Sequence, residues 1–268
     1  MTMYSKSGIT QTAATVTAIM GIEAPLTADC PNEIVVKKAL AALPAGETAY
    51  DRVLLYNPDA VAWWLYQKYT DLFEPALMRT SLQIPAASVM PSVTPVCFAS
   101  MYTGAVPDVH GIKKYEKPVL KTDTLFDAAI RAGKKCAIVS DKAASMAKIF
   151  LERDMDYYLY DTVDEVTAKA LELIREDRYD LLVVYHENYD STMHKNGPEA
   201  EVSLASLRKN SGDFAALADA VREYWRGHRV FYGYCPDHGC HEIDGNCGSH
   251  GLDMDEDMNV IHMFGWCV

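Results

Sequence analysis

Six side chains in the sequence could together bind metal ions. Three are aspartates and three are histidines, and each follows a short apolar run or lies in a glycine-rich loop: Asp59, Asp190, His194, Asp237, His238 and His250. Carboxylates and imidazoles in this ratio suit Zn²⁺ or Mn²⁺, and six of them are enough for two divalent ions. Two ions about 4 Å apart can hold a phosphoryl group while a nucleophile attacks in line. The pattern therefore indicates two-metal chemistry on a phosphoric ester.

Such chemistry also needs a nucleophile, and Thr94 is the candidate. It precedes Pro95 at a point where a turn would enter a helix, and Pro favours the first turn of a helix. The N-terminus of a helix attracts anions, so a phosphate could lie beside the Thr94 hydroxyl. A hydroxyl next to a metal ion loses its proton more readily than a free one and can attack phosphorus.

Each residue also has an ordinary structural interpretation. An Asp after a strand is often a turn or helix-capping residue, and Asp237-His238-Gly239 could be a turn with a surface histidine. Asp190 and His194 could form a solvated pair one helical turn apart, and Thr94 could be an extended residue before Pro95. The order and spacing of all these residues together favour the functional interpretation.

The apolar runs that must position these residues alternate with helical patterns. Residues 53–57, 136–140, 181–185 and 230–234 are typical of buried strands, and residues 260–264 could be a last strand. Helical spacing covers residues 60–72, 125–132, 163–175 and 213–225. This alternation predicts an α/β fold, a three-layer α/β/α sandwich around a mostly parallel sheet of five or six strands. Functional residues of such sheets gather at the carboxyl ends of the strands, where the six side chains are expected.

The composition predicts one globular domain. The 268 residues are 49% hydrophobic and 23% charged, which is enough for a full core. No Gly-, Ser- or Pro-rich linker and no repeat divides the chain. We therefore expect residues 1–268 to form a single catalytic domain, with residues 1–50 as an N-terminal extension packed on it.

Charge and cysteine content restrict the partners and the compartment. Lys and Arg number 25 against 37 Asp and Glu, and the resulting net charge of −12 disfavours a nucleic-acid duplex as partner. The sequence contains no apolar run long enough to cross a membrane, and polar residues interrupt the N-terminus where a secretory signal would be apolar. Seven irregularly spaced cysteines do not form a disulfide framework. These features predict a cytoplasmic protein with a small-molecule substrate.

Four ordered motifs resemble the nucleotide pyrophosphatase/phosphodiesterase branch of the alkaline phosphatase superfamily. The first runs from Thr94 through Thr103-Gly104 to His110-Gly111-Ile112, with the family's spacing around its nucleophile. The others are similar to the family's Asp-Ser-x-Gly-His with Gly-Pro, its Asp-His-Gly and its Gly-x-His-Gly-x-Asp. They are residues 190–198, 237–239 and 248–253, and the resemblance extends from about Val53 to Trp266. It implies an alkaline-phosphatase-like fold with reduced insertions and a metal-dependent phosphodiesterase or nucleotide pyrophosphatase activity.

The resemblance also implies a role for each residue. One metal ion, expected to be Zn²⁺ with Mn²⁺ as the alternative, would be held by Asp190, His194 and His250. The ligands of a second ion would be Asp59, Thr94, Asp237 and His238. Thr94 would form a phosphothreonine intermediate that an activated water hydrolyses.

Three positions depart from the family pattern. Cys97 replaces the Asn that donates to a phosphoryl oxygen three residues after the nucleophile, so Cys97 is the expected but weak substrate contact. Met193 replaces the Gly before His194, and Ala60 replaces the Gly after Asp59. None of these changes removes a metal ligand.

Other functions remain open from the sequence. A phosphomonoesterase, phosphonate hydrolase or phosphosugar mutase of the same superfamily would share the ligands, but monoester enzymes need extra positive charge and no Arg lies in the motifs. A sulfatase is disfavoured because its Cys/Ser-x-Pro-x-Arg motif is absent. A weakened metal-binding protein is the alternative outside enzymes, motivated by Cys97. The aromatic residues Trp63, Trp64, Tyr66 and Tyr69 favour helix packing over a base-stacking platform.

Overall fold

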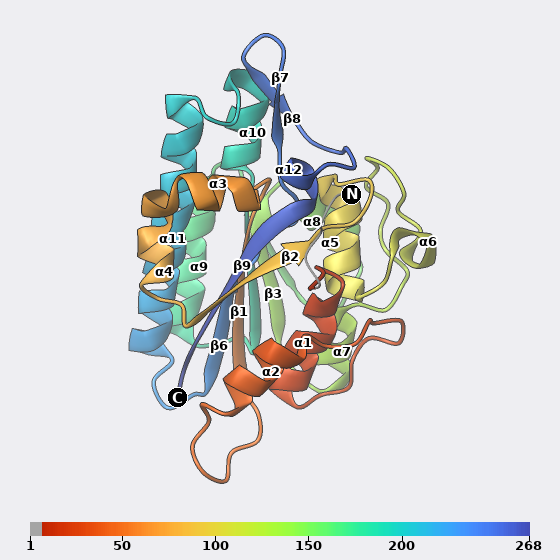
Figure 1. The fold of residues 1–268 in the computed structure, drawn as a ribbon. Coiled ribbons are helices and arrows are strands. Elements are labelled where there is room, and N and C mark those ends of the chain that lie inside the picture. The colour runs from red at the N-terminus through yellow and green to blue at the C-terminus, as the bar shows by residue number, and fades with distance from the viewer. Residues whose placement is uncertain (1–6) are drawn as a thin grey trace.

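A seven-stranded sheet forms the centre of the molecule in the computed structural model, which describes residues 7–268 (Figure 1). Its strand order is β2-β9-β6-β1-β5-β3-β4. The strands are β1 (Arg52–Pro58), β2 (Leu82–Ala87), β3 (Cys136–Asp141), β4 (Asp156–Tyr160), β5 (Leu181–His186), β6 (Val230–Tyr234) and β9 (Asn259–Cys267). Strands β6, β1, β5, β3 and β4 run parallel, and β9 is antiparallel to both β6 and β2. The predicted mostly parallel sheet is confirmed.

Helices cover both faces of this sheet, as an α/β/α sandwich requires (Figure 1). One core cluster joins the sheet to α1 (Gln11–Met20), α2 (Glu33–Leu40), α5 (Thr94–Thr103), α7 (Leu125–Arg131) and α8 (Ser145–Ile149). A second cluster joins it to α3 (Trp63–Lys68), η1 (Thr70–Phe73), α4 (Glu74–Leu77), α9 (Val163–Glu176), α10 (Asn188–Asn196) and α11 (Glu201–Tyr224). The short helices α6 (Pro107–His110) and α12 (Asp255–Met258) and the hairpin of β7 (His241–Ile243) and β8 (Cys247–Ser249) complete the chain.

Several predicted elements differ from the observed ones in extent. The helix expected over residues 60–72 is divided into α3 and η1, and the helix expected over 213–225 is the second half of the 24-residue α11. The edge strand β2 was not predicted, because Pro85 lies in its middle, and Pro cannot donate to a strand ladder. The strand β4 was also missed, although it closes the opposite edge of the sheet.

No helix of residues 7–268 is both long and apolar enough to cross a lipid bilayer.

Candidate metal centre

The carboxyl ends of three adjacent strands bring most of the predicted ligands together. Asp59 follows β1, Asp237 and His238 follow β6, and Asp190 lies on α10, which begins directly after β5. The Asp59 amide donates to the His186 carbonyl at the end of β5, at an N–O distance of 2.9 Å, and this bond ties the two strand ends together. The sheet therefore gathers the aspartates at the carboxyl ends of its parallel strands, as the sequence predicts.

Asp59, Asp237 and His238 form a buried cluster. Their ligand atoms lie within 4.8 Å of one another, and each residue is at most 1% exposed. The His238 Nε2 is 3.3 Å from Asp59 Oδ1 and 3.4 Å from Asp237 Oδ2.

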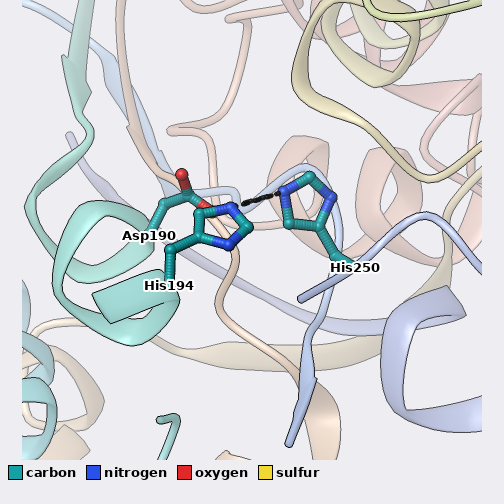
Figure 2. Close-up of side chains that lie close together, drawn as sticks. All are labelled: Asp190, His194 and His250. Carbon is teal, nitrogen blue, oxygen red and sulfur yellow. Dashed lines mark hydrogen bonds and ion pairs between the residues drawn. The ribbon is translucent and has the colours of Figure 1, made fainter. Parts of the chain in front are cut away.

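Asp190, His194 and His250 form a second cluster (Figure 2). Asp190 Oδ1 lies 3.3 Å from His194 Nε2 and 3.4 Å from His250 Nε2, and the two imidazole nitrogens are 3.1 Å apart. The His194 side chain is 40% exposed, so this cluster opens to solvent while the first does not. The rings of His238 and His250 stack with their centres 4.0 Å apart, which makes the two clusters neighbours.

Each of the three histidines presents a lone pair to its cluster. Their Nδ1 atoms lie 2.8–3.0 Å from the main-chain carbonyls of Gly239, Gly248 and Ser92. A carbonyl oxygen only accepts, so each Nδ1 carries the proton and, in the neutral ring, each Nε2 is an acceptor. Among residues 7–268, the buried oxygens Asp59 Oδ1, Asp190 Oδ1 and Asp237 Oδ2 have no hydrogen-bond partner. Hydrogen-bond acceptors that converge in this way without a donor are suited to binding cations. The hydrogen bonds from Nδ1 to the main-chain carbonyls hold the imidazole rings in the orientation that metal binding needs.

Burial shifts the pKa values of two of these groups away from their usual ranges. Burial, followed by the charges of Asp237 and Asp190, raises the pKa of Asp59 well above its usual range. Burial lowers the pKa of His238 well below its usual range, and His250 and His194 lower it further. Burial makes both charged forms costly, and a bound divalent cation would stabilise the ionised carboxylates.

Thr94 is the first residue of α5 and lies against the buried cluster. Its hydroxyl is 3.3 Å from Asp59 Oδ2 and 3.3 Å from His238 Nε2, and the residue is 5% exposed. Val93 precedes it in extended conformation and Pro95 follows in the first helical turn, so α5 begins at the predicted place. The structure thus brings all seven predicted metal-site residues into two adjoining groups.

The comparisons with known proteins identify the family of the chain. The model of the type I phosphodiesterase / nucleotide pyrophosphatase family matches residues 53–256, which is most of the chain. The chain belongs to this family. A comparison with curated protein sequences gives no match.

Solved structures of similar fold include two different proteins. Murine ectonucleotide pyrophosphatase / phosphodiesterase 5, an inactive threonine-to-alanine variant in complex with AMP, is 17% identical, with a TM-score of 0.58. The match covers 73% of this chain and 59% of that one. Phosphonoacetate hydrolase from Sinorhizobium meliloti 1021, in complex with phosphonoformate, is 19% identical with a TM-score of 0.53, covering 76% and 62%. These matches show the fold, and the chain spans about three fifths of the length of either relative.

Cys97 lies inside the core and away from solvent. It is 0% exposed, and its sulfur is 3.1 Å from the Ser88 hydroxyl, which itself donates to the Asp237 carbonyl over 2.7 Å. Burial raises the pKa of the Cys97 thiol well above its usual range. In this arrangement the thiol contacts Ser88, and no surface of Cys97 is exposed to solvent.

The structure accommodates the other two departures from the family pattern, Met193 and Ala60. A Cβ on Gly248 would lie 2.2 Å from the Met193 sulfur, so the larger Met193 side chain occupies space that Gly248 leaves free. Ala60 has φ +64°, a left-handed conformation that favours Gly, and its amide lies 3.4 Å from Asp237 Oδ1.

Tyr185 is a site residue that the sequence analysis missed. Its hydroxyl donates a short hydrogen bond to Asp59 Oδ2, and the ring is buried at the end of β5. The alternation of side chains along β5 offered no distinguishing signal, because every residue of the strand is buried. Only the pairing of β5 with β1 brings Tyr185 to Asp59.

Proposed function

We propose that the protein is a metal-dependent phosphodiesterase or nucleotide pyrophosphatase that works through a phosphothreonine at Thr94. The observation that carries the proposal is the convergence of six metal-ligand side chains on two adjoining positions, with the Thr94 hydroxyl 3.3 Å from Asp59 and from His238. Every ligand that the family motifs require is present, which favours a working enzyme over a weakened binding protein.

The two clusters divide the ligands between two ions. Asp190, His194 and His250 would hold one ion, and Asp59, Asp237, His238 and Thr94 the other, with Zn²⁺ as the expected metal and Mn²⁺ as the alternative. When bound, such ions neutralise phosphoryl oxygens and lower the pKa of a coordinated hydroxyl or water.

The chain's own residues then position the reaction. The Thr94 hydroxyl donates toward Asp59 Oδ2, which leaves an oxygen lone pair for attack on phosphorus. The new bond joins Thr94 Oγ1 to phosphorus while the bond to the leaving alcohol or phosphate breaks; the Thr94 proton passes toward Asp59, and the leaving group departs with the electron pair of the broken bond and takes up a proton. Water then hydrolyses the phosphothreonine and restores the hydroxyl. The partly exposed Asp190–His194–His250 cluster is the side from which water reaches the centre.

Charge around the centre favours a diester substrate. Across the described part of the chain, no Lys or Arg forms an ion pair with Asp59, Asp190 or Asp237. A monoester carries a third charged phosphoryl oxygen that such a side chain would neutralise, whereas a diester does not. The AMP bound to the murine relative is consistent with a nucleotide-containing substrate.

Hydrolysis of matched aryl esters tests this proposal. Purified protein supplemented with zinc or manganese is assayed with bis(4-nitrophenyl) phosphate and with 4-nitrophenyl phosphate, and His250→Ala serves as the ligand-deficient control. We expect the diester to be cleaved at least about tenfold faster, and the variant to lose the activity. Preference for the monoester would favour a phosphatase or mutase, and no turnover of either ester would favour a metal-binding protein.

A further inference from the structure

A cleft of about 420 Å³ lies between α3, β2 and α12 and uses none of the predicted metal ligands. Trp63, Trp64 and Pro85 line it together with Asp255 and Glu256. Its volume is within the range of small-molecule sites. The cleft therefore combines aromatic side chains with carboxylates in a space that could hold a small ligand.

The aromatic side of the cleft is held in place by neighbouring groups. The indole Nε1 of Trp64 donates to the Cys240 carbonyl over 2.8 Å, which fixes the ring. Trp63 packs against Tyr66, with ring centres 5.3 Å apart. Both tryptophans are partly buried, pack against the core cluster on this side of the sheet and keep part of their surface exposed. Ordered and partly exposed indoles offer surface to a ligand at little entropic cost.

The acidic side of the cleft carries uncompensated charge. Asp255 and Glu256 are exposed in the first turn of α12, and the neutral Asn259 side-chain amide donates to the Asp255 main-chain carbonyl over 3.1 Å and to Asp255 Oδ1 over 3.4 Å. Within residues 7–268, neither carboxylate forms an ion pair with Lys or Arg, and no basic side chain lines the cleft. An anion would be repelled here, and a neutral apolar ligand would leave both charges unused.

We propose that this cleft binds an organic ammonium group, such as the head group of a quaternary amine. Indole faces attract cations through the ring quadrupole, and nearby carboxylates add Coulombic attraction. Indoles are not metal ligands, so the aromatic wall favours an organic cation over a bare metal ion. The net charge of −12 raises the local concentration of cations near the whole surface.

Binding of choline and of its uncharged isostere tests the proposal directly. The metal-loaded full chain is titrated with choline and with 3,3-dimethylbutan-1-ol, which has the same shape without the charge, at constant ionic strength. Tryptophan emission and calorimetry report binding independently of any ester hydrolysis. We expect saturable choline binding at least about tenfold tighter than that of the alcohol. Equal binding of the two compounds, or no saturation by choline, would overturn the proposal.

Two substitutions locate the binding in the cleft. Trp63→Leu removes the aromatic face and Glu256→Gln removes one charge, and each should weaken choline binding about 5- to 30-fold. Glu33→Gln, which changes an exposed carboxylate at the start of α2, is the matched control and should bind as the wild type does. If circular dichroism shows that Trp63→Leu is unfolded, Asp255→Asn with Glu256→Gln decides the matter. Wild-type choline affinity in that double variant would contradict the assignment.

Discussion

At the scale of single residues, Tyr185 shows how a side chain without metal-binding chemistry can matter for a metal centre. Its hydroxyl donates to Asp59 Oδ2 and so holds one predicted ligand in place. Outer partners of this kind typically change metal affinity or activity about 10- to 100-fold when removed. We expect Tyr185→Phe to weaken binding of one of two zinc equivalents by that amount, measured by competitive titration.

Tyr234→Phe is the control for this substitution. Tyr234 is equally buried, but its hydroxyl has no partner among the described residues. Its removal should leave both zinc affinities unchanged. Equal zinc affinities in the wild type and Tyr185→Phe would show that Tyr185 only fills space.

Cys97 presents the opposite case, a residue whose predicted role and observed surroundings differ. Because the thiol is fully buried against Ser88, we expect Cys97→Ala to lower the free energy of unfolding by about 1–2 kcal/mol. Loss of one donor to a reacting oxygen typically lowers turnover 10²–10³-fold. Because the buried thiol does not contact the reacting oxygens in this structure, turnover should change by less than about threefold. Urea unfolding and kcat measurements on the same preparation check both statements. A loss of activity beyond tenfold would instead support the predicted substrate contact.

At the scale of elements, hydrogen bonds of the neutral His110 side chain join the segment after α5 to that helix. The Ile112 amide donates to His110 Nδ1 over 3.2 Å, and His110 Nε2 lies 2.9 Å from the Ser100 hydroxyl. Burial lowers the pKa of His110 to about 4 from 6.5. The unfolded chain therefore takes up a proton below pH 6.5 that the folded chain does not take up until about pH 4, so stability falls as the pH falls through this window.

His110→Gln should reduce this pH dependence. Between pH 6.5 and about pH 5, the wild type should lose about 2 kcal/mol of unfolding free energy more than the variant does. Urea unfolding of the metal-free proteins at about pH 7.5 and about pH 5 measures the difference. Equal losses of unfolding free energy in the two proteins would mean that His110 takes up its proton at the same pH in the folded and the unfolded chain.

Elements with a clear pattern of apolar residues could be predicted from the sequence. Elements that depend on tertiary contacts could not. Buried parallel strands such as β1 and β5 are continuous apolar runs. Their positions, and the gathering of the predicted metal ligands at their carboxyl ends, could therefore be predicted. The strand β2 contains Pro85 and pairs with β9 near the edge of the sheet, and its sequence does not show a strand period. Likewise, the contact between Tyr185 and Asp59 depends on the register of two strands that are far apart in the sequence. The organisation of residues 1–268 as a single domain stays a prediction.

At the scale of the whole molecule, metal binding should be part of the stability. Without cations, the two clusters hold three buried carboxylate oxygens that have no hydrogen-bond partner among residues 7–268, and three histidine lone pairs lie beside them. Ligands that bind only the folded state stabilise it by about 2.7 kcal/mol per site at 100 times Kd. For two sites, we expect zinc or manganese to raise the Tm by about 10–20 °C.

Calorimetric scans with metal and with chelator measure this difference. His250→Ala removes a ligand of one cluster, so it should show about half the shift and bind one equivalent less. A Tm that does not respond to chelator would show that the two clusters are not metal sites.

The most direct test of the proposed chemistry compares the wild type with Thr94→Ala on an aryl phosphodiester, with metal content and Tm measured on the same samples. Because the Thr94 hydroxyl is the only nucleophile proposed at the centre, the variant should keep its fold and lose at least about 10³-fold in turnover. Acid-quenched wild type should carry the substrate's phosphoryl group on the peptide that contains Thr94. Thr94→Ala that is folded, metal-loaded and as active as the wild type would contradict the covalent mechanism.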